Sequence, residues 1–572
     1  MSNRPRWLLL LFVFALVVAA CAGDTESTTT TAAPAETTTT AAQATTSTAA
    51  APSSAMTITY DISPDAVWSD GTPITTADFA CTWTATLNTP GSLSTVGYDQ
   101  ITSVSEGSSA QQVVVEFATV YAPYKNLFNP LIPAHVVTDP TCMDVSADFL
   151  DGYGVSGRAW QMESWSLDQA ILTPNPAYWG DDKPVATRLV QVPRAEDGGI
   201  AALQAGEVDF IFPQAFAGIT DALNADNIKF VPGYGTNYEG LYFQQGEVRN
   251  GPFADDDFRA AFSMSIDRAT ILANIYDPIF PGAPLLQCGL WVPTVGPWCQ
   301  NDQFTDSYDP EGAAALLEGA GWVKDGSGMW AKDGVVPEVK WMINTPNPRR
   351  EATQALMIPL LAEAGFNVVA DNGDAAAVFQ QRLPAGDYDL GMYINTASPD
   401  PSVTGIMSCD AVPSADNGNQ GQNSVFWCNE DASAVMAESD TTIDETARAD
   451  LIHQIGQALV DDHVMLPLFQ FPNVAAWRTD RLEGDAPGAD ASNYRAYNNS
   501  SQLWTPLASD EIIVGAEQWP ECLNPITECA NSSWMVWTAA FPVLPGVYDT
   551  TADGNFVVTN LMASDPVVTV NE

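Results

Sequence analysis

Basic side chains are scarce in this chain of 572 residues, which has 21 Lys and Arg against 70 Asp and Glu. The formal net charge of −49 predicts repulsion from nucleic acids and from anionic membrane surfaces, so neither is expected as a partner. No acidic run is concentrated in one place. We interpret the charge as a solvated surface suited to salty surroundings, with attraction of a cationic ligand as the alternative.

Histidine and catalytic signatures are also rare. The three histidines, His135, His453 and His463, are scattered, and no CxxC-like spacing occurs, so no metal site is expected. Neither GxSxG nor HExxH is present, which argues against the alternative of a secreted hydrolase. The chain also lacks a GxxxxGK[ST] run, so ATP hydrolysis is not expected. The sequence therefore predicts a protein that is not an enzyme and has no cofactor.

The N-terminus carries an export signal. Arg4 and Arg6 precede an apolar run over residues 7–20, which is too short to favour a membrane span and suits a signal-peptide core. The run ends in Val-Ala-Ala-Cys21, which resembles a bacterial lipobox. We expect residues 1–21 to be a lipoprotein signal peptide with Cys21 lipidated; an ordinary signal peptide with a chance cysteine is the alternative.

Residues 22–55 follow as a segment rich in Thr and Ala. From residue 24 onward this segment contains no aromatic and almost no bulky aliphatic side chain, so it cannot bury a core. We interpret it as a flexible, disordered tether that lifts a domain off the outer face of the cell membrane.

Cysteine usage agrees with export. Nine cysteines are present, and setting Cys21 aside leaves an even number. Three pairs are close in sequence, which leaves Cys81 to pair with Cys142. Four disulfides in an oxidising compartment are expected. The pairs are Cys81–Cys142, Cys288–Cys299, Cys409–Cys428 and Cys522–Cys529.

Helical and strand-like segments alternate along the rest of the chain, which predicts an α/β fold with partly parallel sheets. The chain is too long for one ordinary domain, so two or three lobes are expected. In residues 56–62 apolar and polar side chains alternate, and residues 111–118 contain an apolar run, so both segments are predicted to be strands. Thr75 or Thr76 can cap a helix that runs to about Leu87. The β-branched run over residues 567–570 predicts a last strand, which needs a neighbour.

Five stretches carry a resemblance to a known family. They are AVWSDGTPITTADFACTW (66–83), NPAYWGDDKP (175–184), ALQAGEVDFI (202–211), FADDDFRAAFSMSIDR (253–268) and YDPEGAAALLEGAGW (308–322). In this order they resemble the family 5 solute-binding proteins of ABC importers, which are extracytoplasmic lipoproteins that bind peptides, dipeptides or nickel. The resemblance runs from about residue 56 to residue 504.

The resemblance implies a bilobal, periplasmic-binding-protein-like fold of class II type, with a hinge cleft between the lobes. We expect a first lobe over residues 56–240, a second lobe over 241–475 and a return to the first lobe over 476–572. The crossings are expected near residues 240–250 and 470–480. A ligand would enter the open form, and the lobes would close over it.

The last part of the chain resembles the segment with which the family normally opens. Residues 510–572 end in one arm of a hairpin whose other arm resembles the strand at Met56. We interpret this as a circular permutation, in which the last and first strands are neighbours. The alternative is a tandem-gene remnant, whose stub would expose strands without a sheet of their own.

The resemblance also suggests where a ligand binds. On the first lobe we expect contacts from Glu517, Gln518 and Trp519, and near the crossing from Asn237, Tyr238 and Tyr242. On the second lobe, Met392–Pro401 (MYINTASPDP) corresponds to the family's W-x-x-D-Y-x-D-P stretch. On this stretch we expect further ligand contacts from Asn395, Ala397 and Asp400.

Two departures from the family pattern stand out. In the family, an Asp at this position pairs with the α-ammonium of a bound peptide, whereas this chain has Ala397. If this protein binds the N-terminus of a peptide, another acidic residue such as Asp400 or Glu517 must supply the counter-charge. Arg158 stands where the family has Pro. It would hold a carboxylate or a phosphate, or else it is a surface substitution.

The expected function is that of a monomeric, lipid-anchored protein that captures an oligopeptide or another small solute and delivers it to ABC permease subunits. A sensor or a peptide chaperone that feeds no transporter is the alternative within the same class.

Overall fold

The computed structural model describes residues 54–194, 196–216, 218–246, 251–305, 307–415, 417, 421–483, 500–531, 535–551 and 554–571. The signal peptide, Cys21 and nearly all of the tether lie outside these residues. Within the described part, no helix has both the length and the apolar character needed to cross a membrane.

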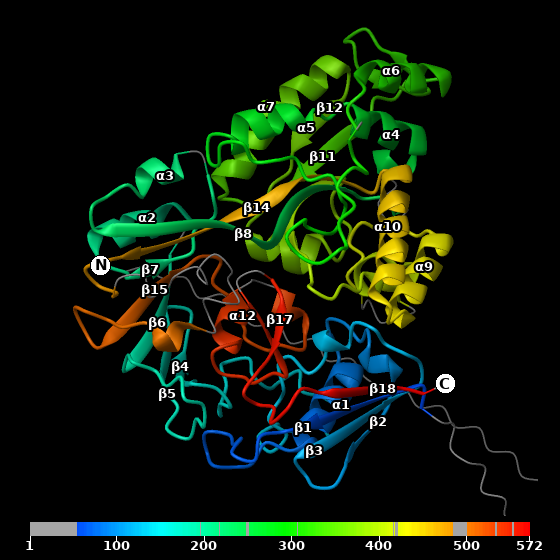
Figure 1. The fold of residues 1–572 in the computed structure, drawn as a ribbon. Helices are drawn as coiled ribbons and strands as arrows, with labels where there is room; N and C mark the ends of the chain where they lie inside the picture. Colours follow the sequence, from blue (N-terminus) through cyan, green and yellow to red (C-terminus); the bar gives the residue numbers. More distant parts are fainter. Residues whose placement is uncertain are drawn as a thin grey trace, which may run out of the picture. The chain divides into compact units, whose positions relative to one another are not determined.

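A ten-stranded mixed sheet runs through the molecule in the order β12-β11-β13-β8-β14-β7-β15-β6-β5-β4. Its strands are β4 (Trp160–Trp165), β5 (Ala170–Pro174), β6 (Arg188–Pro193), β7 (Phe210–Ile211), β8 (Ile228–Phe243), β11 (Glu338–Met342), β12 (Asn367–Ala370), β13 (Leu390–Thr396), β14 (Met465–Arg478) and β15 (Glu511–Ala516). The two long strands β8 and β14 pair with each other and join the two ends of the sheet (Figure 1). The boundaries expected at residues 240 and 475 fall inside these two strands.

A second sheet has four antiparallel strands in the order β18-β1-β3-β2. They are β18 (Val567–Val570), β1 (Met56–Asp61), β3 (Gln112–Phe117) and β2 (Ile101–Glu106). Two small hairpins are also present, β9 (Val323–Lys324) with β10 (Trp330–Ala331) and β16 (Tyr548–Thr550) with β17 (Phe556–Val558). The strands expected near residues 56, 112 and 567 are therefore confirmed.

The helices pack against these sheets. They are α1 (Thr76–Asn88), α2 (Glu196–Ala205), α3 (Ile219–Ala222), α4 (Asp256–Met264), α5 (Arg268–Ile271), α6 (Pro310–Gly319), α7 (Pro348–Ala364), α8 (Thr404–Met407), α9 (Glu430–Thr441), α10 (Glu445–Asp461) and α12 (Met535–Ala540). The helix expected after Thr75 is confirmed, because the Thr75 hydroxyl accepts from Ala77 N and the Asp78 carboxylate accepts from Thr75 N. This reciprocal arrangement satisfies two backbone donors that a helix start leaves open.

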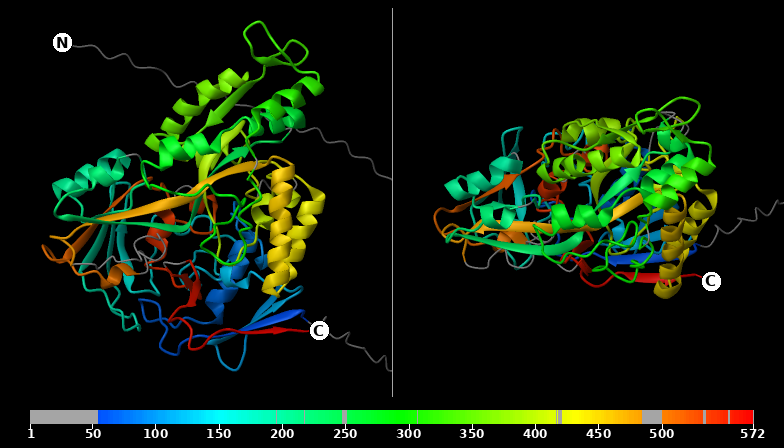
Figure 2. Two further views of the ribbon diagram at one scale, coloured as in Figure 1. Left: turned by 45° about the horizontal axis from the view of Figure 1, so that its top comes forward. Right: turned by 90° about the horizontal axis from the view of Figure 1, so that it is seen from above.

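The C-terminal residues are built into the fold beside the N-terminal strands. β18 pairs with β1 in antiparallel register from Met56↔Val570 to Thr59↔Val567. β15 lies between β7 and β6 and is parallel to both. Both ribbon views show red β18 lying along blue β1 (Figure 2). The last strand therefore has the neighbour that its sequence requires.

Two large hydrophobic cores hold these elements. One packs around β8, β11, β13, α4, α7 and α10, and the other around β1, β3, α1 and the residues after 510. Disulfides join Cys81–Cys142, Cys288–Cys299, Cys409–Cys428 and Cys522–Cys529. These are the four pairs named from the sequence.

Candidate functional site

A cavity of about 380 Å³ lies where residues of the two cores meet. Its walls combine aromatic rings with six side-chain amides. The aromatic residues are Phe212, Phe379, Phe471 and Trp537, and the amides are Gln214, Asn237, Asn395, Gln422, Asn473 and Gln518. Small-ligand sites are concave and usually combine apolar walls with polar groups that orient the ligand, and this cavity has both.

The position of the cavity follows from the sheet. The parallel strands β7 and β15 end at Ile211 and Ala516, and the residues that follow them, 212–214 and 517–518, line the cavity. The end of β13 contributes Ile394, Asn395 and Thr396. Loops at the carboxyl ends of strands commonly form ligand sites in α/β folds.

Asn237 and Asn395 lie on neighbouring strands, and both line the cavity. The Thr396 hydroxyl donates to Asn237 Oδ1 at 2.8 Å, and Asn395 Nδ2 donates to the Tyr242 hydroxyl at 2.9 Å. Asn237 Nδ2 also reaches Asn473 Oδ1 at 3.5 Å. These contacts orient the two amides before any ligand arrives.

Glu517 and Gln518 also line the cavity, directly after β15. Glu517 is 7% exposed, so its carboxylate is almost withdrawn from water. Gln518 has a left-handed backbone with φ of 51°. A non-glycine residue in this region is uncommon and is often found at binding sites.

Five of the nine sequence candidates lie outside the lining, and three of these are aromatic. Tyr238 and Tyr242 are buried in the sheet behind it, where Tyr242 stacks on Tyr393 with ring centroids 4.1 Å apart. Burial raises the pKa of both Tyr238 and Tyr242 above the ordinary tyrosine value. Trp519 points elsewhere, because its indole Nε1 donates to the Ser166 carbonyl at 3.0 Å.

Ala397 and Asp400 also lie away from the cavity wall. Ala397 is buried, and its backbone N donates to the Thr236 carbonyl at 2.8 Å. The Asp400 carboxylate accepts from the guanidinium of Arg448. Burial raises the pKa of the Asp400 carboxyl, against the opposing effect of Arg448. Asp400 is thus already engaged with a cation of its own chain.

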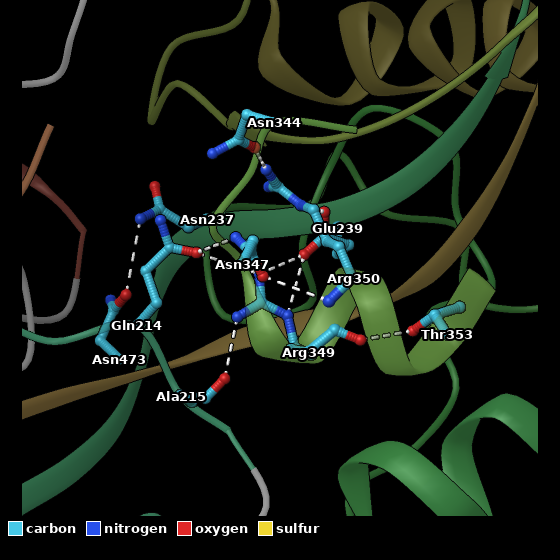
Figure 3. Close-up of polar contacts among 10 residues, drawn as sticks. All are labelled: Gln214, Ala215, Asn237, Glu239, Asn344, Asn347, Arg349, Arg350, Thr353 and Asn473. Atoms are coloured by element: carbon cyan, nitrogen blue, oxygen red, sulfur yellow. Dashed lines mark hydrogen bonds and ion pairs between the residues drawn. The ribbon is translucent and has the colours of Figure 1, made fainter. Parts of the chain in front are cut away.

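A buried cluster of three charged side chains adjoins the cavity (Figure 3). Glu239 on β8 is 0% exposed, and Arg349 and Arg350 at the start of α7 are each 2% exposed. Arg349 Nη2 lies 2.6 Å from Glu239 Oε2, and Arg350 Nε lies 2.8 Å from Glu239 Oε1. Figure 3 shows both arginines converging on this one carboxylate.

The two arginines differ in what else they touch. Arg349 donates to the Ala215 carbonyl at 2.9 Å, lies over the Phe471 ring at 4.6 Å and lines a separate apolar cavity of about 330 Å³. Arg350 donates Nη1 to Asn344 Oδ1 and lines the main cavity. Among the described residues of that lining, Arg350 is the cation and Glu517 the carboxylate.

None of the three residues of this cluster is among the candidates that the sequence indicated. Two signals were available, a glutamate inside the apolar run of β8 and an Arg-Arg pair after Asn347-Pro348 in a chain with few basic residues. Asn347 caps α7 by accepting from Arg350 N at 3.2 Å, which fixes both arginines on the first turn. From the sequence alone, two adjacent arginines at the start of a helix indicate an ordinary helix terminus that is exposed to solvent.

Arg158 does hold a carboxylate, but it is one from this chain. Its Nη1 and Nη2 donate to the two oxygens of Asp549 at 2.7 and 2.6 Å, and its side chain is 13% exposed. The pair joins the loop before β4 to the hairpin strand β16. The alternative of a surface substitution is therefore wrong.

One group of possible metal ligands occurs among the described residues, formed by Cys409, Cys428 and Glu430. Both cysteines belong to one disulfide, so neither can offer a thiolate. The group does not form a metal centre.

Comparison with known proteins identifies the class. The model of family 5 of the bacterial extracellular solute-binding proteins matches residues 44–413, and the chain belongs to this family. Oligopeptide-binding protein OppA of Mycobacterium tuberculosis (strain H37Rv) is 25% identical over 454 residues, which cover 78% of this chain and 74% of that protein.

Solved structures agree on the fold. The oligopeptide-binding protein AppA from Bacillus subtilis, solved with a nonapeptide, has a TM-score of 0.67 at 19% identity, over 79% of this chain and 87% of that one. The periplasmic EDTA-binding protein EppA also has a TM-score of 0.67, at 22% identity, over 79% and 84% of the two chains. The fold is thus the periplasmic-binding-protein fold expected from the sequence. The family consists of solute-binding proteins whose members are extracytoplasmic, and not of enzymes.

Proposed function

We propose that this protein captures a short peptide in the cavity and delivers it to the permease of an ABC importer. The observation that carries the proposal is the amide-rich cavity of about 380 Å³ between residues of the two cores. Six side-chain amides on its walls suit the alternating N–H and C=O groups of a peptide backbone. Aromatic walls supply apolar contact without selecting one side chain. The relatives named for oligopeptide binding support the same solute class.

Glu517 is the residue that we expect to meet the solute's ammonium group. Ala397 occupies the position where the family resemblance places the ammonium-binding Asp, and Asp400 is engaged by Arg448. A buried ammonium without a counter-charge is strongly unfavourable. Glu517 lines the cavity and is nearly buried, so it can supply that counter-charge in a low-dielectric setting.

The test uses the full-length protein, purified in a mild detergent, and a pool of tripeptides to pentapeptides of mixed sequence. Mass spectrometry of the retained fraction should show enrichment of free peptides over the same pool N-acetylated, because acetylation removes the ammonium. Glu517→Gln should reduce that preference roughly tenfold or more. Glu521→Gln, an exposed neighbour in the same loop, is the matched control and should behave as wild type.

Retention of no peptide in any form would contradict the proposed solute class. Equal retention of free and acetylated peptides by the wild type would contradict the role of Glu517 alone. The two results are distinguishable because the first measures whether any peptide is retained, and the second measures the ratio of free to N-acetylated peptides among those retained.

We also propose that the protein is a lipoprotein anchored through Cys21 to the outer face of the cell membrane and that it acts as a monomer. The lipobox-like sequence and the Thr- and Ala-rich residues 22–55 support this arrangement. Cys21→Ala should move the protein from the membrane pellet to the soluble fraction. Persistence in the pellet would contradict lipid anchoring.

Finally, we propose that the chain is a circularly permuted member of its family. The pairing of β18 with β1 and the insertion of β15 between β7 and β6 support this reading, because both strands complete sheets begun by earlier parts of the chain. A tandem remnant would have no reason to fill those positions. The salt bridge between Arg158 and Asp549 further ties the final segment to the rest.

A further inference from the structure

A second cavity, of about 330 Å³, adjoins the main one, and most of its wall is apolar. We call it the apolar cavity. Helix α2 contributes Ile200 and Ala201 to its wall, and helix α7 contributes Pro348. Ala201 and Pro348 are exposed, so the rim of the apolar cavity reaches the surface of the molecule. The main cavity, with its six amides, thus has a neighbour of similar size and different chemistry.

Gln214 is the residue that the described walls of the two cavities share. It lies in the loop that follows β7. Its Oε1 accepts from Asn347 Nδ2 at 2.9 Å and from Arg349 Nη2 at 3.2 Å (Figure 3). Asn347 is 1% exposed and Arg349 is 2% exposed, so packing holds both donors in place. The Gln214 side chain therefore stands as a fixed partition between the two cavities.

The partition determines how much space a solute has. The two cavities have similar volumes, so their union would offer nearly twice the space of the main cavity alone. The main cavity by itself is close to the lower end of the range for small-ligand sites, roughly 300–1,000 Å³. An extended octapeptide spans up to roughly 29 Å. A cavity closed at Gln214 consequently favours short solutes.

We infer that Gln214 sets the upper limit on the length of the solute, because its side chain closes the main cavity toward the apolar cavity. The inference rests on the proposed function and adds to it a residue that determines specificity. A short peptide binds with the partition in place. A longer peptide must displace the Gln214 side chain and break both of its hydrogen bonds, which leaves buried donors without that acceptor.

The first measurement uses the full-length wild type and an equimolar pool of tripeptides to octapeptides of mixed sequence. Mass spectrometry sorts the retained peptides by length. Octapeptides should be retained at least about tenfold less than tripeptides, since one surplus methylene already costs about that factor in a closed pocket. This measurement needs no substitution, so it is independent of any folding defect.

Two matched variants then identify the residue. Gln214→Ala removes the partition and should raise the retention of octapeptides relative to tripeptides about tenfold. The longer peptides that it retains should be enriched in apolar residues, because the space gained is apolar. Gln204→Ala is the control and should keep the wild-type limit, because Gln204 lines the apolar cavity and leaves the partition intact.

Thermal unfolding of both variants controls for a general loosening of the fold. If Gln214→Ala does not fold, Gln214→Ser takes its place, because the hydroxyl shortens the side chain and still offers an acceptor to the donors on α7.

Equal retention of octapeptides and tripeptides by the wild type would overturn this inference and leave peptide binding intact. An unchanged length limit in a folded Gln214 variant, or the same shift in Gln204→Ala, would overturn the assignment to Gln214. Retention of no peptide of any length would instead contradict the proposed function on which the inference rests.

Discussion

Asp440 on α9 is an acidic residue whose environment disfavours its charge. It is 7% exposed, and burial raises the pKa of its carboxyl, although hydrogen bonds from Thr404 and Ser402 and the charge of Arg448 act in the opposite direction. The negative charge of Asp400 adds to the rise. The backbone carbonyl of Asp440 accepts from Ala122 N at 2.6 Å, so this site joins segments far apart in the chain.

This environment predicts a pH-dependent stability. The folded pKa of Asp440 lies above the ordinary value of 3.8, so its contribution is most favourable below that value and is lost as pH rises through the folded pKa. Asp440→Asn cannot ionise. The stability of the wild type relative to Asp440→Asn should therefore fall as pH rises from about 4 to 7, measured by urea unfolding.

Asp431→Asn is the control for this prediction, because Asp431 is an exposed residue of the same helix. Its stability difference from the wild type should change little over the same pH range. A difference for Asp440→Asn that is independent of pH, or that grows in the other direction, would show that the buried carboxyl is not disfavoured as described.

Residue by residue, the sequence indicated part of the site. Glu517, Gln518, Asn237 and Asn395 were named from the family resemblance, and all four line the cavity. Arg350 was not named from the resemblance, because its place in the site depends on contact with Glu239, which is far away in sequence. Only the pairing of β8 with β13 and the packing of α7 bring the cluster to the cavity.

At the scale of the element, helices with strong end signals were predictable and long strands were not. The helix after Thr75 has a reciprocal cap, and Asp309 with Pro310 opens the helix over residues 310–319. β14 contains Pro467 and Pro472, which usually argue against a central strand. The structure places both prolines beside register shifts, where a missing N–H is tolerated.

The last strand, β18, lies beside the first strand, β1, and this neighbourhood allows a direct test of the permutation. Asn571 N donates to the Ala55 carbonyl at 2.8 Å, so the end of β18 lies beside the start of β1. A two-residue Asn-Gly turn can close such a pair of antiparallel strands. Residues 510–571 can therefore be moved between residue 52 and Met56, with one glycine added after Asn571.

We expect this rearranged chain, which ends at Trp504, to unfold at nearly the temperature of the natural one and to bind the same peptides. A variant that simply lacks residues 510–571 should fail to fold, because β15 is a central strand of the ten-stranded sheet. Circular dichroism melts of the three proteins would compare them. A stable truncated variant, or a rearranged chain that does not fold, would contradict the permutation.

At the scale of the whole molecule, the fold class and the two-part organisation of the core were predictable from ordered motifs and alternating segments. The solute was not, because 70 acidic residues contribute to the net charge of −49, whereas the described residues of the cavity wall include one carboxylate, Glu517, and one guanidinium, Arg350. Bulk charge determines solubility and long-range repulsion, whereas the choice of solute depends on a few buried contacts.

We propose that this protein holds a small peptide between residues of its two cores. Native mass spectrometry of the full-length protein, purified from its own host, tests this most directly. We expect a bound species of defined mass that is released on denaturation and fragments into amino-acid residues. A bound species that contains no amino acids would contradict the peptide assignment, and a folded protein that neither carries nor takes up any solute would contradict the claim itself.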